Sequence, residues 1–427
     1  MARDPQSRFS PMSPLLRKLI AHNWLLTLAM AGLLAFGIHA VAIAGEGNPS
    51  PSIQSAYRLQ MVWVFVGAGI YLTTSLIDYR WLVRIGAAPA WLAGVAMLVY
   101  SLFKGHEVND TIGWIKLGSF QFQPSQLAMA AAILAASACL GDLRRVHRFF
   151  RQPFVALALV GILMGIPCLL VLLQGDIGSA LVWLPVSAAL CLVGNIPFRH
   201  LALVVLTALT VLPLFYFFGL KDSRRERIEV YLDMQHGRPV DRDKAYAANH
   251  AYVAVGSGGW NGFQNRVTLS DEAAAGMPGD GGDAPKNSMH AQGLLPLLTV
   301  HNDFIFAVIG ERYGFRGSAM LIFGFCTLLA ICLMIAYRSR DLSGRLIATG
   351  VAALIFSHMF QNMGMMMLLT PITGIPLPFI SYGGTFMVAL LFLMGLVQSV
   401  WIHRDVEEEE KPKPAPALRP LAPGGLA

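Results

Sequence analysis

Two acidic side chains stand where long apolar segments begin, and both have the chemistry of a general base. Asp176 precedes the apolar run that starts at residue 177, and Asp303 precedes the run that starts at residue 304. Glu311 follows Asp303 by eight residues, about two helical turns, so one helix face can hold both carboxylates. A carboxylate at membrane depth is costly and is a candidate for function. Asp is also a favoured helix N-cap, and spacing alone favours capping over catalysis at both positions.

The run Pro-Leu-Pro-Phe-Ile-Ser-Tyr-Gly-Gly at 376–384 joins two long apolar segments and carries no charge. Proline removes a backbone donor, and glycine permits a close approach of the backbone. Such a segment persists at membrane depth only when it is buried in protein or lines a polar cavity. We therefore expect this run to belong to a binding site. Its candidate binding residues are Ser381, Tyr382, Gly383 and Gly384.

The composition places these residues in a polytopic membrane protein. The chain has 427 residues, of which 55% are hydrophobic and 13% charged, and its mean hydropathy is +0.55. A soluble domain carries about 25% charged residues. A membrane span needs about 20 apolar residues, and the sequence predicts an all-α fold with ten transmembrane helices. These lie near 23–44, 58–77, 83–103, 124–141, 153–173, 177–195, 200–220, 304–337, 346–368 and 380–402.

The distribution of basic residues predicts the orientation of the helices. In a ten-span arrangement nearly all of the arginines of the short loops fall on one side, and the short loops of the other side carry only Lys104 and Lys116. By the positive-inside rule, both termini are cytoplasmic. The net charge of +7 is therefore explained by topology, and no nucleic-acid partner is expected. The basic loop 144–151 is also suited to contact with anionic membrane lipid, but orientation alone explains it better.

The sequence divides into three parts. Residues 1–22 form a cytoplasmic N-terminal segment, 23–402 form the transmembrane domain, and 403–427 form a disordered cytoplasmic tail. The transmembrane domain contains a large extracytoplasmic loop at 221–302. All five cysteines fall in predicted spans without metal-binding spacing, so they are interpreted as apolar packing residues. In the ninth span, His358, Gln361 and Asn362 lie at helical spacing, which favours interhelical hydrogen bonding over the lining of a polar cavity.

Several short motifs resemble those of the SEDS family, the FtsW, RodA and SpoVE proteins of bacterial cell-wall synthesis. The segment 370–384 resembles the family's signature, and 301–311 resembles its His-Thr-Asp-Phe-Ile-Phe-Ala segment before a Glu. The segment 174–179 is similar to Gln-Pro-Asp-Leu-Gly-Thr. The Arg-rich stretch 224–228 and the Gly-Ser-Gly-Gly turn 256–259 also match. The matching blocks follow the family's order from about 110 to 390.

The resemblance implies a peptidoglycan glycosyltransferase in the bacterial cytoplasmic (inner) membrane. Such an enzyme joins lipid II units outside the membrane, holds the undecaprenyl-linked glycan and releases undecaprenyl pyrophosphate. The family's presumed catalytic acid maps onto Asp303, and Glu311 matches the first Glu of the following pair. A sugar 4-hydroxyl is a poor nucleophile, and a carboxylate within hydrogen-bond reach can act as its general base. The resemblance also implies a class B penicillin-binding protein as the partner, and a role in cell shape or division.

The departing pyrophosphate needs cations or backbone donors to stabilise its charge. The resemblance and the loop sequences point to basic side chains, a glycine turn and a divalent metal ion such as Mg or Mn. For the arginines a solvated helix face, and for the glycines a flexible bend, are equally good explanations. The candidate substrate-binding residues outside 381–384 are Lys116, Asp176, Arg224, Arg225, Arg227, Gly256, Gly258, Gly259 and Glu311.

Three positions depart from the family's pattern near the expected site. Gly113, Gln126 and Met129 stand where the family usually has Arg, Glu and Lys. Either other groups such as Lys116 and Arg312 compensate, or the enzyme is weakened, specialised or inactive. The chain is therefore also compatible with a non-catalytic scaffold or activator of a penicillin-binding protein, and with a lipid II flippase.

Overall fold

The computed structural model describes residues 18–46, 48–108, 111–118, 120–143, 148–202, 206, 222–263, 288–290 and 292–404. Within these residues, eight helical segments are long and apolar enough to cross a membrane, and the helix α10 (Ile177–Val193) is a shorter apolar one. The eight are α2 (Trp24–Gly45), α4 (Ala56–Leu76), α5 to α6 (Tyr79–Lys104), α7 with its short extension (Pro124–Asp142), α9 (Pro153–Leu173), α15 (Ile305–Arg338), α16 (Leu342–Met366) and α17 (Gly384–Ile402).

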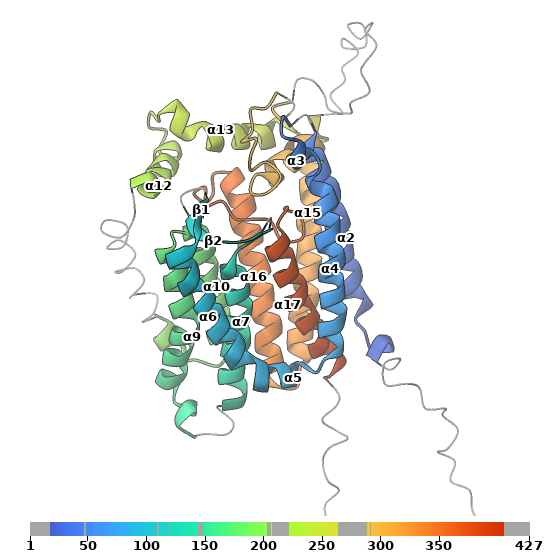
Figure 1. The fold of residues 1–427 in the computed structure, drawn as a ribbon, viewed down its shortest axis with the longest axis vertical. Helices are drawn as coiled ribbons and strands as arrows, with labels where there is room; N and C mark the ends of the chain where they lie inside the picture. Colours follow the sequence, from blue (N-terminus) through green and yellow to red (C-terminus); the bar gives the residue numbers. More distant parts are fainter. Residues whose placement is uncertain are drawn as a thin grey trace, which may run out of the picture.

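The predicted all-α polytopic fold is confirmed, and nine of the ten predicted spans coincide with these helices. The seventh, at 200–220, lies outside the described residues except for 200–202 and 206. The helices form one upright bundle (Figure 1). Helices α7, α16 and α17 are largely buried at its centre, whereas α4, α6 (Ala87–Lys104) and α9 keep much of their apolar surface exposed, as lipid-facing helices do.

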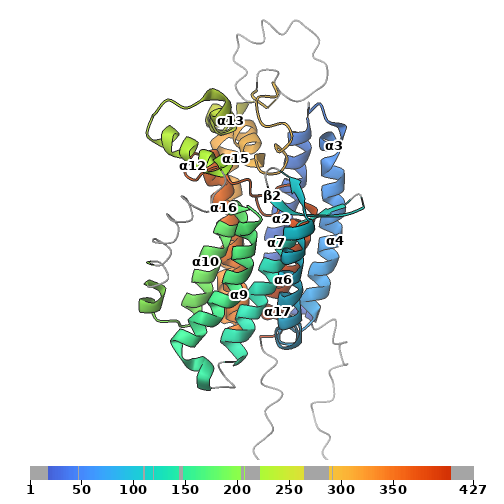
Figure 2. The ribbon, with the colours of Figure 1, turned by 60° about the vertical axis from the view of Figure 1, so that its left-hand side comes forward.

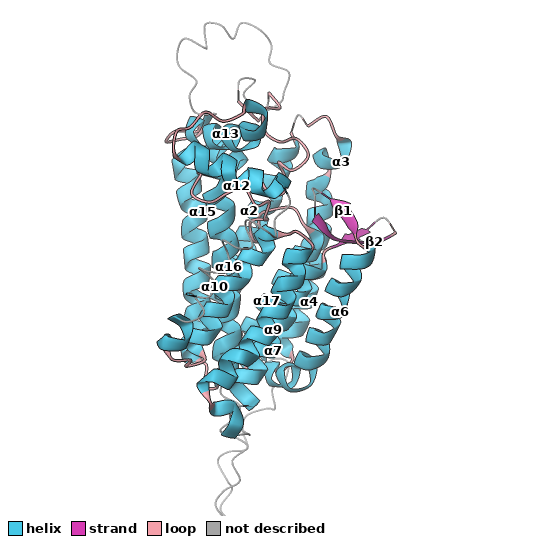
Figure 3. Cartoon of the chain, turned by 90° about the vertical axis from the view of Figure 1, so that its left-hand side faces the viewer, coloured by secondary structure: helices cyan, strands magenta, loops and turns pink. Residues whose placement is uncertain are grey.

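One end of the bundle carries the small elements that surround the site. These are α3 (Pro51–Gln54), α12 (Asp222–Gln235), α13 (Arg242–Ser257) and three short strands, β1 (His106–Val108), β2 (Thr111–Leu117) and β3 (Phe120–Phe122). The strands form an antiparallel sheet in the order β1-β2-β3, which the sequence did not predict. Figures 2 and 3 show the sheet and the two helices above the same end of the membrane bundle.

The opposite end holds α5 (Tyr79–Trp81) and basic side chains that were expected on one side of the membrane (Figure 1). The Nζ atom of Lys18 donates to the carbonyl of Leu76, 2.6 Å away. The Arg338 and Arg404 guanidinium groups both lie over the ring of Trp401, at the end of α17. The two ends of the described chain therefore lie at the same end of the bundle.

Helix α15 is broken at Gly314, and the turn after α13 fills the break. Gly314 has φ +63°, so the helical hydrogen-bond pattern is interrupted there. The freed amides of Phe315 and Arg316 donate to the carbonyls of Gly259 (2.8 Å) and Trp260 (3.2 Å). This contact fixes α13 to the membrane helix α15.

Replacing Gly314 tests this contact. A Cβ at Gly314 would lie 2.3 Å from the Gly262 amide nitrogen and would require a left-handed conformation that L residues rarely adopt. We expect Gly314→Ala to lower the free energy of unfolding by about 1–3 kcal/mol. The matched control is Gly69→Ala in α4, where a Cβ meets no atom within 4 Å. Thermal unfolding in detergent checks both variants, and equal melting temperatures would contradict the account of the break.

Candidate active site

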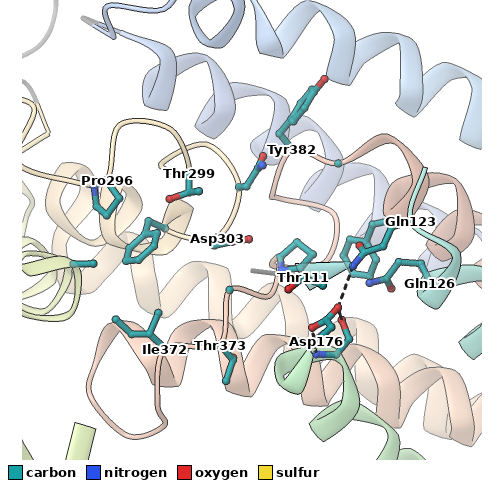
Figure 4. Close-up of a pocket in the computed structure, with 18 of the residues that line it drawn as sticks. Thr111, Gln123, Gln126, Asp176, Pro296, Thr299, Asp303, Ile372, Thr373 and Tyr382 are labelled. Carbon is teal, nitrogen blue, oxygen red and sulfur yellow. Dashed lines mark hydrogen bonds between the residues drawn. The ribbon is translucent and has the colours of Figure 1, made fainter. Parts of the chain in front are cut away.

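A cavity of about 840 Å³ lies at the end of the bundle that carries α12, α13 and the strands. Its walls come from the starts of α7 and α10, the loop before α15, the non-helical segment 367–383 and the beginnings of α4 and α17. Figure 4 shows Asp176 and Asp303 among the side chains that line it. The cavity thus joins motifs that are far apart in the sequence.

Asp303 lies in the cavity wall at the start of α15. The N-cap position of that helix is Phe304, whose own side chain makes no capping hydrogen bond. Asp303 is therefore not the N-cap residue that its spacing favoured. Gly374, with φ +68°, passes so close that a Cβ there would lie 3.2 Å from the Asp303 Oδ2 atom. The carboxylate thus lies beside the backbone of the segment that leads into 376–384.

Asp176 both caps a helix and lines the cavity. Its Oδ1 accepts from the Ser179 amide (2.9 Å), and its Oδ2 accepts from the Ser179 hydroxyl (2.6 Å). The Nε2 of Gln123 donates to the same Oδ2 at 3.1 Å. The capping interpretation is confirmed for this residue. Because Gln123 precedes α7 and Asp176 precedes α10, the interaction also joins two helix starts in the wall.

The centre of the run 376–384, residues 377–381, is buried, and side chains bind its polar backbone. The Ser381 hydroxyl donates to the Asn302 carbonyl (2.6 Å) and accepts from the Leu377 amide (2.7 Å). Gln60 in α4 donates to the Ser381 carbonyl (3.0 Å) and accepts from the Gly383 amide (3.4 Å). The bond to Asn302 holds the run against the loop before α15, and the two bonds of Gln60 hold it against α4. Tyr382, Gly383 and Gly384 line the cavity, whereas Ser381 lies behind the wall.

His301 supports this wall without adding charge to it. It is buried, its ring centroid lies 5.2 Å from that of Tyr382, and its carbonyl accepts from the Tyr382 amide. Burial lowers the pKa of His301 to about 4, so the ring is neutral near pH 7. Burial also raises the pKa of the Tyr382 hydroxyl, which stays protonated.

Other predicted site residues lie away from the cavity wall. Glu311 is buried, and its carboxylate accepts from the amides of Met289 (2.6 Å) and His290 (3.1 Å). Lys116 is exposed on β2, opposite Gln121. The carboxylates of Asp303 and Glu311 therefore have different surroundings, although the helical spacing suggested that they share one face of the helix.

The glycine turn 256–259 packs on α15. A Cβ at Gly258 would lie 1.9 Å from the Gly310 carbonyl oxygen, and Gly259 supplies a carbonyl to Phe315. Neither these two residues nor Gly256 belongs to the cavity lining. The turn therefore fills a close backbone contact, which is neither of the explanations that its sequence suggested. Arg224 and Arg227 are in α12, but their side chains lie outside the part of the chain that is described.

The three departures from the family's pattern occupy well-packed places. Gln126 lines the cavity, and Met129, one turn later in α7, is 4% exposed in the apolar core. Gly113 is buried, and a Cβ there would lie 3.3 Å from the Gln174 Oε1 atom. Among the described lining residues there are two carboxylates, Asp176 and Asp303, and no Lys, Arg or His.

Sequence reasoning missed several residues that build the wall. Trp63 of α4 lines the cavity and packs on Gly384, where a Cβ would lie 2.6 Å from its ring. Tyr231 of α12 also lines the cavity, and its hydroxyl donates to the Leu369 carbonyl at 3.0 Å. Gln60 had a detectable signal, because it is a lone amide in an apolar span. Trp63 had none, since an aromatic residue in a span is usual.

Comparison with known proteins agrees with this geometry. RodA of Treponema pallidum, described as a peptidoglycan glycosyltransferase, is 27% identical over 435 residues, which is 88% of this chain and 97% of the relative. MrdB of Escherichia coli K12, described in the same way, is 30% identical over 296 residues, 68% of this chain and 71% of the relative.

Solved structures show the same fold. The crystal structure of the rod shape determining protein RodA from Thermus thermophilus matches with a TM-score of 0.62 at 26% identity, covering 90% of this chain and 98% of that one. A chain from a study of polymerization and crosslinking by a peptidoglycan synthase complex matches with a TM-score of 0.69 at 26% identity, covering 90% and 99%. A model of the cell cycle proteins FtsW, RodA and SpoVE matches residues 18–266 and 276–406, and the chain belongs to this family.

Proposed function

We propose that this protein is a peptidoglycan glycosyltransferase that polymerises lipid II at the outer face of the cytoplasmic membrane. The observation that carries the proposal is the position of Asp303. It is not at the N-cap position of α15, and it lies in a cavity at the end of the bundle opposite α5 and the basic residues Lys18, Arg338 and Arg404. By the positive-inside rule that end faces outward, and both termini are cytoplasmic. The names of the relatives support the same activity.

The reaction assigns Asp303 the role of general base. The 4-hydroxyl of one lipid-linked sugar attacks C1 of the next, and a new glycosidic bond forms. Asp303 accepts the hydroxyl proton, while the bond from C1 to the pyrophosphate oxygen breaks and undecaprenyl pyrophosphate leaves. The Asp303 carboxylate is half-buried beside the Gly374 backbone, and a carboxylate held in one orientation is suited to this transfer.

We further propose that a divalent cation, Mg or Mn, accompanies the pyrophosphate. The described cavity wall supplies two carboxylates and no cationic side chain, so a pyrophosphate group would be repelled without a counter-charge. No cluster of three or more His, Cys, Asp or Glu side chains occurs among the described residues. This donor set fits a hard cation that takes one or two carboxylates and the phosphate oxygens as ligands. Asp303 and Asp176 would hold it, and it would neutralise charge on the leaving group.

A class B penicillin-binding protein is the proposed partner, since a structural neighbour comes from a complex that polymerises and crosslinks peptidoglycan. The second candidate function is a weakened or inactive scaffold for such a partner. The packing of Gly113 and Met129 favours it, because apolar or small groups fill places where the family has charges. Asp303 in the cavity wall favours the enzyme, and the two candidates separate in the experiments below.

The central prediction concerns Asp303→Asn. The amide keeps the size of the side chain but cannot accept a proton, so the polymerisation rate should fall by at least about 100-fold. Labelled lipid II, the purified protein and its partner provide the assay, with products separated by length. Asp341→Asn at the opposite end of the bundle is the control, since it makes the same change in a carboxylate that does not line the cavity. Normal strands from folded Asp303→Asn protein would refute the assignment.

Removal of divalent metal is the second prediction. Without a counter-charge beside two carboxylates, the pyrophosphate should bind and leave poorly, so chelation should abolish polymerisation and added Mg or Mn should restore it. Initial rates across a metal titration measure the effect, while thermal unfolding reports that the chelated protein remains folded. Full activity in excess chelator would exclude the proposed cation.

The α7 departures generate the third prediction. Met129→Lys buries an unpaired charge in the apolar core and should cost about 3 kcal/mol of stability. Residues 126 and 129 are one helical turn apart, so adding Gln126→Glu should recover part of that loss. Melting temperatures of the single and double variants check this, and equal values would contradict a pairing between the two positions. Increased polymer yield from the double variant would mark the departures as weakening the enzyme.

A further inference from the structure

Asn362 in α16 joins two non-helical segments with one amide group. The side chain is fully buried, and its Nδ2 donates to the carbonyl of Asp303 at 2.9 Å and to that of Ile375 at 2.7 Å. The sequence favoured interhelical hydrogen bonding for this residue. Instead, its two N–H groups bind the loop before α15 and the segment between α16 and α17.

The carbonyls of Asp303 and Ile375 both lie outside regular helix. The first turn of α15 closes from the Ala307 amide to the Phe304 carbonyl at 3.0 Å, one residue beyond Asp303. Ile375 lies in the segment 367–383, which is not helical. Buried carbonyls without a donor are unfavourable, most of all inside a membrane protein. A side-chain donor from a neighbouring helix is therefore required at both places.

The same amide controls the surroundings of the Asp303 carboxylate. Its first bond holds the backbone that carries the carboxylate. Its second bond holds Ile375, and the preceding Gly374 is the residue whose Cβ position lies 3.2 Å from Asp303 Oδ2. A shift of Asn362 would therefore move the carboxylate and the adjacent backbone relative to each other.

The contact continues toward the second carboxylate. Thr373 packs so closely on α10 that a Cβ at Gly178 would lie 2.5 Å from its carbonyl oxygen. Gly178 belongs to the first turn of the helix that Asp176 caps. The segment 373–375 thus lies between the two acidic residues of the cavity, and Asn362 fixes one end of it.

We propose that Asn362 is a positioning residue that sets the orientation of the Asp303 carboxylate for proton transfer. The proposal rests on the function proposed above. Asn362 is absent from the cavity lining, so its effect on the reaction is transmitted through the Asp303 and Gly374 backbone. A displacement of a catalytic group by about 1 Å lowers the reaction rate by about 100-fold. Substrate binding depends on contacts over the whole cavity, so the same displacement should change binding much less.

Steady-state kinetics of Asn362→Leu test the proposal, since leucine has a similar size and no donor. We expect kcat to fall by about 30–100-fold while KM for lipid II changes less than about twofold. The matched control is Ser357→Ala, because Ser357 is buried in the same helix and its hydroxyl bonds only within that helix, to the Ala353 carbonyl, in the contacts described. An unchanged kcat, or a rise in KM alone, would overturn the proposal.

The pH dependence of kcat in Asn362→Asp distinguishes the proposed role of Asn362 from a purely structural one. When protonated, the new carboxyl has one O–H to donate; when ionised, it faces two carbonyls with none. The ratio of its kcat to the wild-type kcat should therefore decline as pH rises. A ratio independent of pH would argue against a donor requirement. This variant also decides the matter if Asn362→Leu fails to fold.

Hydrogen exchange separates this proposal from the proposed function. In Asn362→Leu the backbone amides of 299–306 and 372–378 should exchange faster, while the amides near α5 at the other end stay unchanged. Mass spectrometry of the intact chain in detergent measures both regions. Failure of the wild-type protein to make polymer would refute the proposed function. The exchange rates of Asn362→Leu and wild type would still test whether Asn362 holds the two segments. Equal exchange in variant and wild type would overturn the role of Asn362.

Discussion

The arrangement of this protein depends on satisfying a non-helical backbone inside a helical membrane bundle. Segment 367–383 interrupts the helices, and Ile375 and residues 377–381 within it are buried, so their amides and carbonyls need partners other than those of a regular helix. Gln60, Asn362 and Ser381 supply these partners from α4, α16 and the segment itself. Ser381 and Asn362 also donate to the carbonyls of Asn302 and Asp303 before α15, so bonds that satisfy this backbone also hold Asp303 in place at the cavity.

Close approaches of the backbone to its neighbours also hold the cavity walls in place. Gly374 allows the segment to pass beside the Asp303 carboxylate, and Gly384 allows the start of α17 to lie on the Trp63 ring. Gly258 and Gly314 likewise allow the backbone after α13 to contact the backbone of α15 closely. At Gly258, Gly314 and Gly384 a Cβ would collide with a neighbour, and at Gly374 the contact would be tight and φ is +68°, so local geometry explains these glycines. The cavity is thus built by contacts that leave little freedom to its walls.

The sequence predicted the parts of this fold that depend on local properties. Hydropathy and length located nine of the spans, and the proline and glycine content of 376–384 identified a buried connection. The residue type at Asp176 also predicted its cap. These features need no knowledge of neighbours, because a span or a cap is determined by the residues next to it in the chain.

The remaining features depend on which segments meet. The turn 256–259 has the composition of an anion-binding nest and of a close helix contact alike, and only the position of Gly310 distinguishes them. Glu311 lies on the same helix as the residues that follow Asp303, yet its carboxylate binds the amides of 289 and 290. Helical spacing predicts which residues share a face of the helix, but it does not predict which residues that face contacts. The sheet β1-β2-β3 is similarly a consequence of pairing between short segments with weak individual signals.

The charges of the cavity link its construction to its chemistry. Relative to the family's usual residues, Gly113 and Met129 remove two cations, and Gln126 removes one anion. Lys116 and Arg312, the nearest candidates for compensation in the sequence, are not among the cavity-lining residues. Charge–charge interactions strengthen in a partly buried site. The cation proposed above would supply the counter-charge that the described lining residues do not provide for a phosphorylated lipid.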